Sequence, residues 1–165
     1  MIFCRRVVSS GGQRGLTLIE LIIALVILGI LAAAALPMAE VAVTRGKELE
    51  LRRSLRDMRS AIDAWKADFD KAVAEKKITP SINETGYPES LEQLVEGNDW
   101  GGLYPYKRRY LRRIPVDPFD EHQEGWGMRS YKDDPDSTIY GGEDLYDVYS
   151  QSTRLALDGT PYNTW

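Results

Sequence analysis

Residues 15–36 decide the fold, and they read GLTLIELIIALVILGILAAAAL. After its first residue the stretch is almost wholly apolar, and its length matches the roughly 20 residues that an α-helix needs to cross a bilayer. Residues 1–15 are basic and contain no acidic residue. Their arginines, Arg5, Arg6 and Arg14, favour a cytoplasmic N-terminus, because basic residues flank membrane spans on the cytoplasmic side. We therefore expect a single membrane pass near the N-terminus and an extracytoplasmic remainder.

Three interpretations of this segment differ in how they treat one acidic residue. An ordinary secretory signal would use residues 16–31 as its apolar core and would be cleaved after Ala35. A plain membrane anchor would keep the whole segment. Neither interpretation accounts for Glu20, because an acid in an apolar span costs several kcal/mol if it faces lipid alone. A third interpretation has to give that acid a role.

The junction around Gly15 and Glu20 resembles the class III leader of type IV pilins, pseudopilins and related prepilins. In that family a membrane-embedded aspartyl peptidase cuts after the glycine and methylates the new N-terminal amine. The resemblance implies cleavage between Gly15 and Leu16, N-methylation of Leu16, and a role for Glu20, the fifth mature residue, in assembly. Pro37 becomes the twenty-second mature residue, where the family often has a helix-kinking proline. Leu16 stands where the family usually has phenylalanine.

Beyond residue 41 apolar residues recur at spacings of three and four, which predicts that the helix continues out of the membrane with one apolar face. This apolar stripe consists of Leu51, Leu55, Met58, Ile62, Trp65, Phe69 and Val73. We expect one helix over residues 17–76, with the stripe packed against the rest of the domain. Pro37 lacks an amide hydrogen and predicts a kink, and Gly46 is a second weak point.

The remainder of the chain is expected to form a small head. Residues 79–86 are rich in residues that break helices and predict a loop. A short helix is expected over residues 89–95 with Pro88 in its first turn, and strands over residues 126–131 and 145–150. A small antiparallel sheet on the apolar stripe would bury both apolar faces. The fold class is therefore α+β, a pilin-like lollipop with a leader (1–15), a membrane and assembly helix (16–37), a periplasmic helix half (38–76) and a head (77–165).

The head resembles one branch of the same family, the major pseudopilins of type II secretion systems. Residues 110–119, YLRRIPVDPF, look like the segment before the sheet in that branch, and residues 146–150, YDVYS, look like its last strand. The branch lacks a disulfide-closed loop, which agrees with the absence of cysteine after Cys4. The resemblance implies a structural subunit of a short periplasmic filament that drives protein export. Its partners would be other pseudopilins, the prepilin peptidase and an inner-membrane assembly platform.

Two alternatives remain open at this stage. A true or minor type IV pilin, for adhesion, motility or DNA uptake, would share the same N-terminus. A signal-anchored periplasmic binding protein would instead hold a ligand in residues 77–165. Each of the three places the chain in the inner membrane by a single pass, with a cytoplasmic N-terminus and a periplasmic head.

Composition and motifs argue against catalysis and nucleic-acid binding. The net charge is -4, and without residues 1–15 the chain keeps 18 basic against 25 acidic residues, which is unfavourable for binding phosphates. The single histidine, His122, lies in a charged stretch without a nucleophile beside it, so we expect no enzyme activity.

Acidic residues in the last third of the chain raise the question of calcium, which takes six to eight oxygen ligands. These residues are Asp133, Asp134, Asp136, Glu143, Asp144, Asp147 and Asp158, and their spacing does not match an EF-hand loop. Major pseudopilins bind calcium in their closing loop, and the resemblance makes Ser150 and Asp158 candidate contacts. The chain lacks the further acids that the family supplies after Asp158. No other cofactor is expected.

Overall fold

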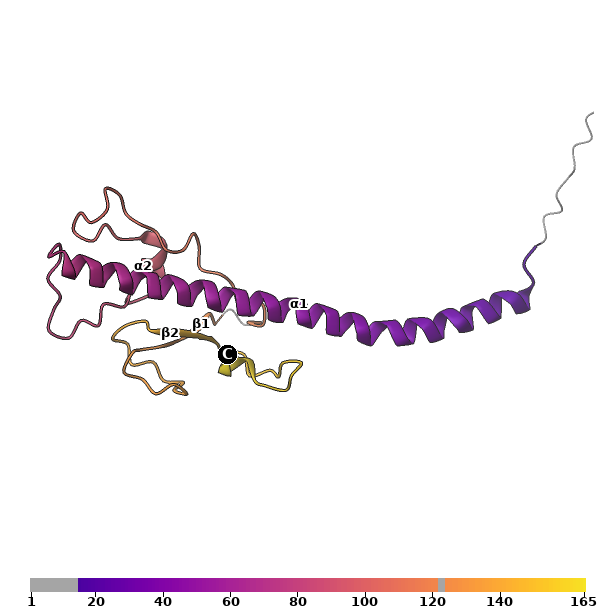
Figure 1. Ribbon diagram of the computed structural model, residues 1–165. Coiled ribbons are helices and arrows are strands. Elements are labelled where there is room, and N and C mark those ends of the chain that lie inside the picture. Colours follow the sequence, from indigo (N-terminus) through magenta and orange to yellow (C-terminus); the bar gives the residue numbers. More distant parts are fainter. Residues whose placement is uncertain (1–14, 122–123) are drawn as a thin grey trace, which may run out of the picture. The chain divides into compact units, whose positions relative to one another are not determined.

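The computed structural model describes residues 15–121 and 124–165. The arginines of the leader, Cys4 and His122 lie outside the described residues, so the structure says nothing of their predicted roles. The chain divides after Glu40 into two compact units, which are described separately below. One helix, α1 (Leu18–Ala74), contributes residues to both units (Figure 1).

Helix α1 contains Pro37 and Gly46 without an interruption, and it ends two residues before the predicted boundary. The end is a Schellman motif. Lys76 adopts a left-handed conformation with φ 56°, its N–H bonds to the carbonyl of Val73, and the N–H of Lys77 bonds to that of Ala72. Residue 76 therefore lies just outside the helix that the sequence predicts to include it.

The second unit adds a short helix, two strands and one 3₁₀ turn to the C-terminal half of α1. These are α2 (Leu91–Glu96), β1 (Trp126–Arg129), β2 (Asp147–Ser150) and η1 (Tyr162–Thr164). The strands pair antiparallel, with Trp126 opposite Ser150. In Figure 1, α2 and the two strands lie along different edges of α1. A long helix with a small antiparallel sheet confirms the predicted α+β fold class.

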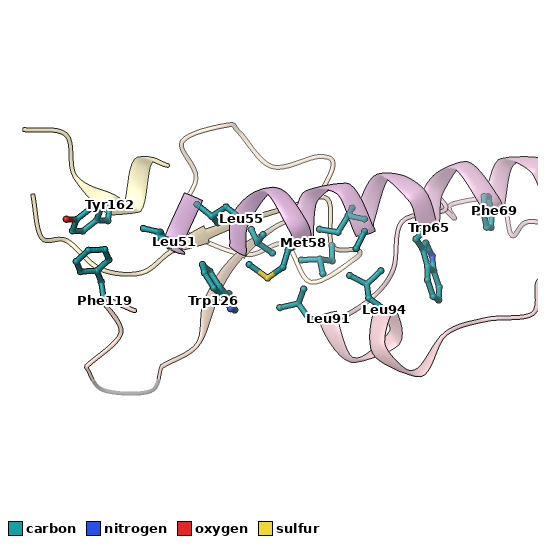
Figure 2. Close-up of a cluster of buried hydrophobic side chains, with 14 of the residues drawn as sticks. Leu51, Leu55, Met58, Trp65, Phe69, Leu91, Leu94, Phe119, Trp126 and Tyr162 are labelled. Carbon is teal, nitrogen blue, oxygen red and sulfur yellow. The ribbon is translucent and has the colours of Figure 1, made fainter. Parts of the chain in front are cut away.

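The core of this unit forms on the predicted apolar stripe. Six of the seven stripe residues are buried, and Val73 is partly buried against them. Figure 2 shows side chains of α1 directed toward Leu91 and Leu94 of α2 and Trp126 of β1. Full burial of one large apolar side chain stabilises a fold by roughly 1.5–3 kcal/mol, so the stripe carries much of the stability of the head. The prediction of a packing face on α1 is confirmed.

The short helix begins later than predicted because Pro88 belongs to the preceding loop. Its carbonyl accepts a hydrogen bond from the N–H of Leu145 at 2.6 Å, which ties it to the segment before β2. Ser90 occupies the N-cap position, and α2 starts at Leu91. The prediction that Pro88 lies in the first helical turn is wrong.

Both strands are shorter than predicted because side chains take over main-chain groups beyond the ladder. The N–H of Ser130 donates to Asp133, and the N–H of Tyr131 donates to Asp144, at 2.7 and 2.8 Å. Strand β1 therefore ends at Arg129. Before β2, the N–H of Leu145 is used by the loop that contains Pro88.

Candidate processing and assembly site

The start of α1 is fixed by a threonine cap directly after the predicted cleavage site. The main-chain N–H of Glu20 donates to Oγ1 of Thr17 at 3.3 Å, and the N–H of Leu21 donates to the Thr17 carbonyl at 3.2 Å. This is half of a capping box, in which a Thr at the N-cap precedes a Glu by three residues. The spacing of Thr17 and Glu20 could have revealed the cap from the sequence, but the sequence analysis did not include Thr17.

Gly15 and Leu16 lie before the helix, without regular secondary structure, and are exposed. The Leu16 side chain is 75% exposed. A Cβ built on Gly15 would have no atom of the described residues within 4 Å. Packing within the described chain therefore does not require glycine at this position. A requirement for glycine here would have to come from a partner that reads the exposed junction.

Glu20 lies in the first turn of α1 with an exposed side chain. Within residues 15–121 and 124–165 its carboxylate has no ion pair. Its neighbours Ile19 and Leu21 are 61% and 51% exposed. The structure therefore shows an acid on an apolar helix surface that the described part of the chain leaves without a counter-charge.

The N-terminal part of α1, residues 18–37, is called its apolar half, and it is long and apolar enough to cross a membrane. An 18-residue window of this helix has a mean hydropathy of 2.8, and none of that window is buried inside the structure. Pro37 lies near the end of this apolar run, inside the helix. The kink that the sequence predicts at Pro37 stays a prediction.

In the head, a buried carboxylate ties α1 to the loop after α2. Asp68 is 6% exposed and accepts hydrogen bonds from the hydroxyls of Tyr104 and Tyr110 and from the guanidinium of Arg108. Burial, followed by the hydrogen bond to Asp68, raises the pKa of the Tyr110 phenol. The sequence analysis did not single out Asp68. Asp68 lies three residues after Trp65 and therefore beside the apolar stripe. This position is the only feature of the sequence that could have pointed to it.

Two polar residues of α1 hold the last segment of the described chain. Arg59 donates from Nε to Asp147 at 2.7 Å and from its terminal nitrogen to the main-chain oxygens of Val148 and Trp165. Glu48 accepts from the N–H of Leu157 at 2.7 Å and from the Tyr162 hydroxyl at 3.1 Å. The helix therefore orders β2 and the segment after it by hydrogen bonds as well as by apolar contact.

The two candidate calcium contacts have other partners in the structure. Ser150 is fully buried, and its hydroxyl accepts a hydrogen bond from the N–H of Ser152. The carboxylate of Asp158 accepts from the N–H and hydroxyl of Thr160 and lies 3.6 Å from Arg52. These hydrogen bonds, ahead of the arginine, lower the pKa of Asp158.

Among the described residues there is no group of three or more His, Cys, Asp or Glu side chains placed to hold a metal. The structure therefore supplies no argument for calcium at this site, and the expectation stays a prediction.

Comparison with known proteins bears on both ends of this arrangement. The prokaryotic N-terminal methylation motif matches residues 11–36. At its N-terminus the chain is therefore similar to prepilins. It is also 29% identical over 109 residues to type II secretion system core protein G of Pseudomonas aeruginosa, a match that covers 65% of this chain and 68% of that protein. No solved structure matches the chain significantly.

These similarities extend beyond the first 36 residues of the chain. The methylation motif contains Gly15, Leu16 and Glu20, whereas a match over 109 residues is longer than the motif and has to include part of the head. The secretion-system relative supports the interpretation of the chain as a pseudopilin, and neither comparison favours a true pilin over it.

Proposed function

We propose that this chain is a pseudopilin, a structural subunit of a short periplasmic filament that drives protein export by a type II secretion system. The observation that carries the proposal is the apolar half of α1, which follows the start of the N-terminal methylation motif and has an 18-residue apolar window with no residue buried inside the described chain. Exposed apolar surface of this extent requires a membrane or copies of the same helix. The proposal gives the chain a structural role and no catalytic one.

Processing supplies the first step of the proposed function. The prepilin peptidase would read the open junction at Gly15 and release residues 1–15, and the amine of Leu16 would be methylated. That amine is a cation four residues before Glu20, so cleavage creates the counter-charge that the described chain lacks. Before assembly the amine and Glu20 of one chain are neighbours on the first helical turn.

In the filament, Glu20 of each subunit would neutralise the amine of an adjacent subunit. Pairing of opposite charges is stronger in an apolar setting than at a wet surface, although the cost of removing both from water offsets part of the gain. The ion pair would set the axial register, and the apolar side chains around it would supply the contact area. An inner-membrane platform with a cytoplasmic ATPase would extract subunits from the membrane and extend the filament.

Intact mass of the membrane-extracted protein tests the processing step. The expected mass corresponds to residues 16–165 with one added methyl group. An N-terminus at Leu36, which secretory cleavage after Ala35 would produce, would contradict the proposal. Substitution of Gly15 by a bulky residue is the matched variant and should leave the chain uncleaved. The head should fold unchanged, because the described chain leaves open space around Gly15.

Deletion of the gene in its own host tests the assignment to secretion. We expect loss of secreted proteins from the medium with surface pili and motility unchanged, and recovery when the full chain is restored. Loss of pili with normal secretion would instead assign the chain to the pilin class. Neighbouring genes provide an independent check, since secretion and pilus operons encode different components.

A further inference from the structure

A groove on the head combines aromatic rings with acidic residues. It has a volume of about 490 Å³, and its lining includes Trp65, Phe69 and Trp100. Four acids, Glu84, Glu89, Glu143 and Asp144, contribute to the same lining, which contains no lysine, arginine or histidine. We call this feature the acidic groove.

The chemistry of the acidic groove suits a cationic side chain. Asp144 is buried and accepts from Thr85, Ser130 and Tyr131, and Glu143 already pairs with Lys132. Glu84 and Glu89 are exposed and have no ion pair within the described residues. A guanidinium or ammonium group would gain from charge-assisted hydrogen bonds to these two carboxylates.

A second surface of the head offers such cations without partners. Lys107, Arg109, Arg112 and Arg113 are exposed, and none of them forms an ion pair with any residue in 15–121 or 124–165. Their neighbour Arg108 is the exception, because it is bound to Asp68. Three of the four, with Tyr110 and Leu111, line a depression beside α1. We call the four residues the basic strip.

The acidic groove and the basic strip lie on neighbouring faces of α1. Successive helical residues are rotated by about 100°, so Ala64 and Lys66 lie to either side of Trp65. Ala64 lines the depression that contains the basic strip. Lys66 lies 5.9 Å from the ring of Tyr87, which lines the acidic groove. Asn98 and Trp100 of the groove lining are hydrogen-bonded to Arg108 and Tyr110, so this packed segment lies between the two surfaces. Within the described residues no acid of the groove pairs with a cation of the strip, and both surfaces are therefore available to another molecule.

We propose that the acidic groove of one subunit binds the basic strip of a second copy of this chain. The inference rests on the proposed filament and names a contact between its heads. Two different surfaces meet in such a contact, and repetition of a head-to-tail contact that does not close into a ring produces an open filament. Charge complementarity would orient the heads, while the apolar helices supply most of the contact area.

Charge reversal in the full chain tests the contact. Glu89→Lys and Arg109→Glu should each reduce the number of filaments formed by the processed protein by about tenfold. Either reversal places two like charges at the proposed contact and removes the attraction between Glu89 and Arg109. The combined variant restores opposite charges and should return to within about threefold of the unaltered chain. Asp136→Lys and Lys77→Glu are matched controls outside both surfaces and should leave filament number unchanged. Processing and thermal unfolding should be normal in every variant.

Disulfide trapping provides a second measurement that does not depend on filament number. The chain has a single cysteine, Cys4, which processing removes with the leader. Processed filaments that carry Glu89→Cys and Arg109→Cys together should therefore form covalent ladders under mild oxidation, whereas Asp136→Cys with Lys77→Cys should not.

The other possible outcomes distinguish a failure of the proposed contact from a failure of the proposed function. Filaments that form normally with both single reversals, or a combined variant that stays as defective as the singles, would overturn the contact and leave the proposed function standing. Loss of secretion with unaffected filaments would assign the acidic groove to a basic segment of another protein and also overturn it. Failure of the unaltered processed chain to form filaments would overturn the proposed function, and the contact with it.

Discussion

The two halves of α1 differ in whether the rest of the described chain buries their apolar residues. Leu25, in the apolar half, is 59% exposed, whereas Leu55, in the head, is 2% exposed. Both are leucines in one continuous helix. The head half buries its apolar stripe against its own chain, and the first half has nothing in the described chain to bury against. A leucine in the head therefore stabilises the fold, whereas a leucine in the apolar half is left for contact with lipid or with another subunit.

The acids of the two halves repeat the contrast. Asp68 is buried with three donors around it, and Glu20 is exposed without an ion pair in the described chain. A buried charge is tolerated only where partners are supplied. The comparison is consistent with the proposed function, in which the first half of α1 is the main surface for assembly.

Glu20→Leu should have the largest effect, because it removes the only charged side chain of residues 16–37 and leaves the amine of Leu16 without its proposed partner. The variant makes the helix more apolar, so we expect normal insertion, normal cleavage and no filaments under overproduction. Thermal unfolding of the head should be unchanged. Abundant filaments from the processed variant would show that Glu20 serves only recognition by the peptidase or the methylating activity.

Trp65→Ala should destabilise the head by about 3–5 kcal/mol, as truncation of a large buried aromatic side chain does. Trp65 is 6% exposed and packs edge-to-face on Trp100 at 4.7 Å. Leu25→Ala is the matched variant in the exposed half and should leave head unfolding unchanged. Calorimetry of the detergent-solubilised full chain measures both. Equal melting temperatures for the two variants would abolish the distinction between the halves.

Asp68→Asn should cost about 3 kcal/mol, since it leaves the Arg108 guanidinium next to a neutral group in a partly buried site. Asp70→Asn is the control two residues away, where an exposed pair with Lys66 contributes less than about 1 kcal/mol. Urea unfolding of the two variants gives the difference. A loss at Asp68 as small as that at Asp70 would mean that the buried cluster is not required by the head.

Tyr162→Phe should have the smallest effect, a loss of about 1 kcal/mol at neutral pH from the hydrogen bond to Glu48. Burial, and then the bond to Glu48, raises the pKa of Tyr162 to about 12 from 10.0. The stability that Tyr162 contributes is thus fully present below pH 10 and is lost as the pH rises from 10 to about 12. Stability measured against pH should show the gap between parent and variant closing over that interval. A constant gap would contradict the raised pKa.

Local patterns were sufficient to predict the helix and its packing face. A period near 3.6 placed Leu55, Met58 and Ile62 on one side because burial of one helical face depends on spacing alone. The prepilin junction was likewise visible in consecutive residues. These features need no knowledge of distant contacts.

The parts that were missed depend on contacts between distant segments. Strand β1 ends where Asp144 captures the N–H of Tyr131, thirteen residues away, and Pro88 is held out of α2 by Leu145. Arg59 lies outside the predicted apolar stripe, yet it binds Asp147 and two main-chain oxygens. No pattern of residue types within one segment contains such pairings.

The distribution of tryptophan gives the molecule a built-in optical reporter. All four tryptophans, at positions 65, 100, 126 and 165, lie in the head, and the apolar half of α1 has none. Indole emission from purified filaments, or from the purified chain in protein-free vesicles, would therefore originate from the head alone, without labels. The Trp65 and Trp100 rings meet at 71°, close enough for their electronic transitions to couple. A split circular-dichroism band from this pair would show that the head is folded. The band could be measured with the chain in lipid.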